Sequence, residues 1–148
     1  MAEIWALSML VMGGLFSGGV VAIAWERLPA WRDMELAAFR AAFAHTLQRM
    51  DRLQPALLLM CLLSTVGFAI GASGIARTSA VVAGAGFLVI LAGSGAWLVP
   101  LQKRLIAASP DVPSVELERL RRQWVRGHLV RTVVALTALA FAAAAALV

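Results

Sequence analysis

The chain has a single cysteine, Cys61, among its 148 residues. One thiol can form neither an intramolecular disulfide nor the thiolate cluster that zinc or an iron–sulfur centre requires, so we interpret Cys61 as a small buried hydrophobic residue. The sequence also lacks a phosphate-binding loop, a nucleophile elbow, a zinc motif and carboxylate pairs at hydrolase spacing. These absences leave few catalytic options.

Charged residues are scarce as well. They make up 14% of the chain, against roughly 25% in a soluble domain, whereas hydrophobic residues reach 61%. Because whole segments carry no polar residues, the sequence predicts an integral membrane protein whose main partner is the lipid bilayer. The formal net charge is +5, but the arginines lie beside apolar segments without an aromatic-rich basic module, so we expect no nucleic-acid partner.

Four apolar segments are long enough to be predicted as membrane spans. The first has no preceding Lys or Arg and exceeds the length of a signal-peptide core, so we expect it to remain uncleaved. Pro29 is predicted to stop or kink the first span, Pro55 to occupy the first turn of the second, and Pro100 to interrupt the third. The predicted spans are Ile4–Trp25, Pro55–Ala72, Ala80–Leu101 and Leu129–Val148.

The fourth span is predicted to be part of a longer helix that begins near Ser114, with Ser114 as N-cap after Pro110 and Pro113. Residues 33–53 have the spacing of an amphipathic helix, which either lies at the membrane interface or extends the second span. The predicted fold is therefore all-α: a four-transmembrane-helix bundle forming one domain over residues 1–148.

Basic residues are distributed unequally among the connections. Five arginines lie between the first two spans and six Lys or Arg between the last two, whereas the short second connection has only Arg77. The positive-inside rule then puts both basic connections in the cytoplasm and both termini outside. We expect a multi-pass protein of a bacterial inner membrane, with the fourth helix extending into the cytoplasm.

Glycines recur within the spans at spacings that allow close helix packing. We interpret them mainly as packing positions, within the bundle or in a homo-oligomer. The alternative is that Phe16 and Ser17 line a cavity left by the missing side chains. The glycines concerned are Gly14, Gly18, Gly67, Gly71, Gly84, Gly86, Gly93 and Gly95.

The stretch RRQWVRGHLVRT, residues 121–132, places a stripe of polar and aromatic side chains on one helix face beside the membrane. Arg131 is suited to bind an enolate oxygen, His128 to move a proton, and Trp124 to form a flat wall. The alternative is an interfacial tryptophan belt with snorkelling arginines. The stripe is Arg121, Trp124, His128 and Arg131; Arg119, Arg122 and Arg126 fall on another face, suited to lipid headgroups.

The chain has two histidines, His45 and His128, which the predicted topology places on the same side of the membrane. Together they could ligate a haem or a copper ion, or one could act as a general base. They could equally be two unrelated interfacial residues.

Several motifs together resemble the anthrone oxygenase-like family of small four-helix membrane proteins. They are FSGG in the first span, Pro29, WLVPLQKRL from Trp97 to Leu105, and RRQWVRGHLVRT. Val99, Pro100 and Leu101 match the family motif at the end of the third span. Gln102 stands where the family usually has asparagine, and its longer side chain would move a hydrogen bond by about one methylene.

The resemblance implies a membrane oxygenase that oxidises a flat, apolar phenolic or polyketide-type substrate, with dioxygen as co-substrate and no added organic cofactor. The expected catalytic residues are then His128, Arg131, Trp124 and His45, and the expected substrate-binding residues are Arg121, Phe16 and Gln102. Two other functions remain open at this point. One is a haem- or copper-binding electron carrier using His45 and His128, and the other is a non-catalytic membrane interaction subunit.

Overall fold

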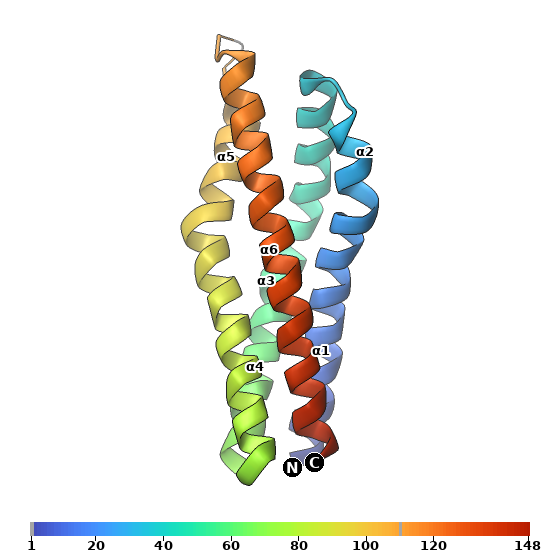
Figure 1. Ribbon diagram of the computed structural model, residues 1–148, viewed down its shortest axis with the longest axis vertical. Helices are drawn as coiled ribbons and strands as arrows, with labels where there is room; N and C mark the ends of the chain where they lie inside the picture. Colours follow the sequence, from blue (N-terminus) through green and yellow to red (C-terminus); the bar gives the residue numbers. More distant parts are fainter. Residues whose placement is uncertain (1, 110) are drawn as a thin grey trace.

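The computed structural model describes residues 2–109 and 111–148 and folds them as a bundle of long helices. Figure 1 shows both chain termini and the α3–α4 connection at one end of the bundle. The opposite end, which we call the basic end, holds α2, α5 and the first residues of α3 and α6. The elements are α1 (Ala2–Ala22), η1 (Ile23–Arg27), α2 (Leu28–Arg32), α3 (Leu36–Gly71), α4 (Gly74–Gly93), η2 (Ser94–Leu98), α5 (Val99–Ala107) and α6 (Ser114–Leu147).

Four of these helical stretches are long and apolar enough to cross a membrane, which confirms the prediction of a multi-pass membrane protein. They are Ala2–Arg32, Arg52–Gly71, Gly74–Ala107 and Ser114–Leu147. The amphipathic segment extends the second span, because α3 is continuous over 36 residues. At 1.5 Å per residue such a helix is about 54 Å long, so it exceeds the roughly 30 Å hydrocarbon core of a bilayer.

The three helix-associated prolines all lie inside continuous helical stretches. Pro55 lies well inside α3, so its predicted first-turn position is wrong. Pro29 and Pro100 do not end their helices either: each follows a π-helical turn, η1 or η2. Proline crowds the carbonyl four residues before it, and a wider turn gives that carbonyl room. The chain therefore continues in helical form on both sides of these two prolines.

The fourth long helix begins at Ser114, as predicted from the sequence. The predicted capping role is wrong, however, because the N-cap residue is Pro113 and no side chain caps this end. The backbone amides of Glu116 and Leu117 donate to the Pro113 carbonyl instead. Leu117 and the buried residues that follow it along α6 point into the bundle, so the helix brings the 121–132 stretch into the core.

The glycine positions show how the helices are rotated. A Cβ on Gly86 would lie 2.9 Å from the Cβ of Ala138, so this glycine permits close contact between α4 and α6. Gly67 packs similarly under the Trp5 ring. Gly14 and Gly18 have no atom of a described packing neighbour within 4 Å of such a Cβ, so their predicted packing role within the bundle is wrong. The same holds for Gly71, Gly93 and Gly95.

Candidate functional site

A cavity of about 220 Å³ lies within the bundle, and we call it the central cavity. Both π-helical turns border it, η1 through Ile23 and η2 through Ser94 and Leu98. A π turn is wider than an α turn and is often found at functional sites. Most of the lining side chains are apolar, and the polar ones are Gln54, Ser94, Gln102 and Arg131.

Arg131 contributes a cation to this apolar surface and is held there by His128. Nη2 of Arg131 lies 3.0 Å from Nδ1 of His128, and Nε2 of His128 lies 3.0 Å from the carbonyl oxygen of Val20. A carbonyl only accepts, so we assign the proton to Nε2, and the bare Nδ1 accepts from the guanidinium. Both ring nitrogens of this fully buried imidazole are therefore engaged.

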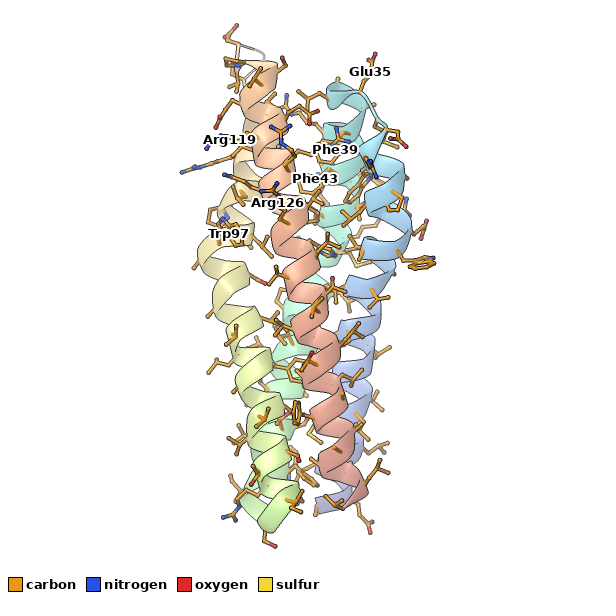
Figure 2. The ribbon with its side chains drawn as sticks, viewed as in Figure 1. Glu35, Phe39, Phe43, Trp97, Arg119 and Arg126 are labelled. Carbon is orange, nitrogen blue, oxygen red and sulfur yellow. The ribbon has the colours of Figure 1, made fainter. Side chains whose placement is uncertain are left out.

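Trp124 forms a fixed aromatic wall of the central cavity. Its ring is stacked on the His128 imidazole, with centroids 5.0 Å apart and an interplanar angle of 18°. Its other contacts include the ring of Phe43, edge-on at 4.7 Å and 88°, and the ring of Trp31 at 6.2 Å. Figure 2 shows Phe39 and Phe43 between the helices near the basic end, where they pack with Trp31. These contacts leave the indole little freedom to rotate.

Four of the side chains predicted to form a site border the central cavity. Trp124 and Arg131 come from α6, Phe16 from α1 and Gln102 from α5. Phe16 is 2% exposed and Gln102 is 6% exposed, so both lie in the interior. His128 lies behind this surface, joined to Trp124 by stacking and to Arg131 by a hydrogen bond. The structure thus brings together residues from three parts of the chain that are far apart in sequence.

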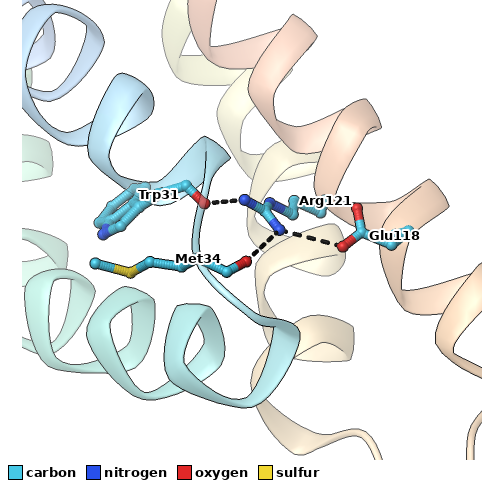
Figure 3. Close-up of polar contacts among 4 residues, drawn as sticks. All are labelled: Trp31, Met34, Glu118 and Arg121. Atoms are coloured by element: carbon cyan, nitrogen blue, oxygen red, sulfur yellow. Dashed lines mark hydrogen bonds and ion pairs between the residues drawn. The ribbon is translucent and has the colours of Figure 1, made fainter.

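Arg121 lies on the predicted face of α6 but makes a different set of contacts (Figure 3). Its guanidinium donates to the carbonyl oxygens of Trp31 and Met34 and forms an ion pair with Glu118 at 3.1 Å. It also stacks over the Phe39 ring at 4.5 Å. Carbonyls at the end of a helix attract cations, so Arg121 ties the end of α2 to α6. These contacts favour a structural role over the predicted binding of substrate.

His45 is not brought to His128. Its side chain is exposed on α3 and is not among the described residues that line the central cavity, whereas His128 is fully buried. Among residues 2–109 and 111–148 no group of three or more His, Cys, Asp or Glu side chains could hold a metal ion. The positions of the two histidines therefore give no support to a haem or copper site shared between them.

Two polar residues of the central cavity were missed in the sequence, Gln54 and Ser94. Oε1 of Gln54 and Oγ of Ser94 are buried and have no hydrogen-bond partner among the described residues. A Cβ on Gly19 would overlap the Gln54 amide nitrogen, so the missing side chain of Gly19 makes room for this amide. The sequence signal that could have identified them is a polar side chain in or beside an apolar span. Gln54 directly precedes Pro55, and Ser94 lies between two glycines of the third span. Unpaired buried oxygens are costly, and they are satisfied when a ligand or water binds.

The chain was compared with known protein families, curated proteins and solved structures. The family model described as anthrone oxygenase matches residues 43–141, which is 99 of the 148 residues. The matched segment runs from α3 into α6 and includes Gln102, Trp124, His128 and Arg131. No curated protein and no solved structure matches the chain. The match covers well over half of the sequence, and the chain belongs to the anthrone oxygenase family.

Proposed function

We propose that the protein is a membrane oxygenase that uses dioxygen to oxidise a flat, apolar, phenol-type substrate in the central cavity. The observation that carries the proposal is the Arg131 cation at a mostly apolar cavity that has the Trp124 indole as one wall. A planar aromatic ketone can lie against that indole while its oxygen approaches the guanidinium. Such a substrate is soluble in the bilayer that surrounds the bundle.

Arg131 favours the anionic form of the substrate. A positive charge within about 4–6 Å favours ionisation of an acid by about ten- to a thousandfold, and low polarity around the pair strengthens the attraction. Ionisation of an anthrone-type ketone produces an enolate, whose electron-rich ring system can reduce dioxygen. Arg131 therefore acts on the step that makes the substrate reactive.

The reaction balances without an added redox cofactor. A C–H bond of the reacting methylene breaks to give the enolate and a proton, and the enolate donates electrons to dioxygen as a C–O bond forms. The distal oxygen takes up a proton to give a hydroperoxide. Loss of the second C–H proton then breaks the O–O bond, so the methylene becomes a carbonyl and the other oxygen leaves as water.

His128 acts in this scheme as a positioning residue, a change from the general base expected from the sequence. Both of its nitrogens are engaged, and the ring lies behind Trp124 and Arg131. Gln54 Oε1 and Ser94 Oγ have no hydrogen-bond partner among the described residues, and they are suited to hold a water molecule that relays the first proton to a base in the solvent.

The dimensions of the central cavity limit the substrate. Its volume of about 220 Å³ is below the roughly 300–1,000 Å³ typical of pockets for drug-sized ligands. Met50 borders the cavity and has an adaptable side chain, so the space can adjust to a flat ligand. We therefore expect a compact ring system and not a long-chain polyketide.

The test measures oxygen uptake by detergent-purified protein with a hydroxylated anthrone, together with the quinone formed. We expect one dioxygen consumed per carbonyl produced, and a fall in kcat of at least about 100-fold for Arg131→Met. Arg119→Met is the matched control, because Arg119 is exposed on the same helix and pairs only with Glu116 among the described residues. Full activity in Arg131→Met, or no anthrone-dependent uptake by the unmodified protein, would contradict the proposal.

A further inference from the structure

A second and larger cavity, of about 830 Å³, lies between α2 and α6 on the outside of the bundle. We call it the outer groove. Its described lining residues differ from those of the central cavity, whose lining includes Ile23 and Trp124. Arg121 ties the two walls of the groove together at the basic end through the Trp31 and Met34 carbonyls (Figure 3).

The outer groove changes from apolar to charged along its length. Its walls run in opposite directions, because α2 approaches the basic end and α6 leaves it (Figure 1). The half nearer the bundle centre is lined by Ala24, Leu28, Val125 and Leu129. The half nearer the basic end is lined by Arg32, Asp33, Glu118, Arg121 and Arg122, and Arg126 lies beside Val125 where the two halves meet. The groove therefore matches an amphiphilic ligand, whose polar head would lie at the charged end and whose apolar tail would lie at the apolar end.

The charges available in the groove are mainly positive. Arg32, Arg122 and Arg126 are exposed and have no ion-pair partner among the described residues. Glu118 is already paired with Arg121, which leaves Asp33 as the carboxylate without a described partner in this lining. Three arginines facing one such carboxylate favour an anionic ligand.

Exposed tryptophans mark the depth of this groove in the membrane. Trp25 is 85% exposed in η1 and Trp97 is 49% exposed in η2. Figure 2 shows Trp97 on the outer side of the bundle, farther from the basic end than Arg119. Exposed tryptophans of membrane proteins gather at the boundary between headgroups and acyl chains. Since Trp25 follows Ala24 directly, this boundary lies near the Ala24 end of the outer groove, with the arginines on the headgroup side of it.

We propose that the outer groove binds one anionic phospholipid. Its phosphate lies among Arg32, Arg122 and Arg126, and one acyl chain follows Ala24 and Leu129 toward the bilayer centre. Basic pockets between transmembrane helices bind lipid headgroups through the same combination of charge and apolar contact. The site is separate from the central cavity, so it does not depend on the oxygenase proposal.

Native mass spectrometry of the full chain, released from detergent with added lipid, tests the proposal. The probes are phosphatidylglycerol and phosphatidylcholine with identical acyl chains. We expect one retained phosphatidylglycerol per chain, and retention about 30-fold weaker in Arg122→Gln/Arg126→Gln, since each of the two arginines near a headgroup contributes a factor of about five to six. The matched control, Arg49→Gln/Arg52→Gln, removes the same charge at two exposed α3 positions outside the described lining of the groove.

Three results would overturn the proposal. Equal retention of the anionic and the zwitterionic lipid would show that charge does not select the ligand. Equal loss in the two double variants would show general surface attraction and no defined site. Displacement of the phosphatidylglycerol by millimolar inorganic phosphate would show a phosphate site without acyl-chain binding. The four arginines are exposed, so thermal unfolding of both double variants should match that of the unmodified protein.

Discussion

Replacing His128 distinguishes a positioning residue from a general base. Glutamine can replace both hydrogen bonds of the imidazole, because its carbonyl oxygen can accept from Arg131 while its amide nitrogen donates to the Val20 carbonyl. An amide does not take up a proton at neutral pH. We therefore expect His128→Gln to keep kcat within about tenfold of the unmodified protein, whereas removal of a true base costs about 10²–10⁴-fold.

His128→Leu is the companion variant, because it keeps an apolar side chain in the space but makes neither bond. Interhelical hydrogen bonds in membranes contribute about 0.6 and at most about 1.7 kcal/mol, and a bond to a charged group about 1.5–3 kcal/mol. The variant should therefore lose about 2–5 kcal/mol of unfolding free energy. Its kcat should fall about 100-fold, because Arg131 is no longer held in place.

Oxygen uptake across pH and thermal unfolding in detergent measure these effects. A positioning role predicts that His128→Gln keeps the shape of the pH–rate profile, because no titrating group of the reaction is removed. The reasoning is refuted if His128→Gln loses activity as completely as His128→Leu while remaining as stable as the unmodified protein. In that case the imidazole itself moves the proton.

Two further predictions concern the bundle and are measured by thermal unfolding in detergent. Arg121→Met should cost about 2–4 kcal/mol, because the buried guanidinium bonds two carbonyls and Glu118, whereas Arg119→Met removes a solvent-exposed pair and should have little effect. Equal effects of the two would contradict the structural role of Arg121. Gly86→Leu should destabilise the bundle by at least about 1–3 kcal/mol because it meets Ala138, and Gly14→Leu should have little effect. A larger loss in Gly14→Leu would mean that α1 packs through this glycine.

Much of the architecture follows from local properties of the sequence. Apolar length predicts the four spans, and helical spacing correctly places Trp124, His128 and Arg131 on one face of α6. The separation of the exposed Arg122 and Arg126 from that face also follows from spacing alone. These features depend on 3.6 residues per turn and require no knowledge of neighbouring helices.

The remaining features depend on how helices are rotated against one another. Gly14 and Gly18 point outward, whereas the adjacent Gly13 faces Cys61 and the adjacent Gly19 faces Gln54. The spacing of glycines in the sequence cannot show which of two adjacent glycines faces a neighbouring helix. The exposed position of His45 and the partners of His128 are likewise set by packing between α1, α3 and α6. Gln54 and Ser94 become recognisable as site residues only when the cavity between the helices is known.

The two π turns each hold one residue more than a regular α-helix needs to face the same neighbours. Each turn spans one residue more than an α turn, as shown by the bonds from the Leu28 amide to the Ile23 carbonyl and from the Val99 amide to the Ser94 carbonyl. Each wide turn therefore takes up one residue without rotating the helix that follows it. Deleting one residue from η1 would restore a regular α-helix and leave Leu28 and Trp31 facing the core, whereas the same deletion within α1 would rotate everything after it by about 100°. Single-residue deletions should therefore be better tolerated at these two turns than in the α-helical parts of the spans.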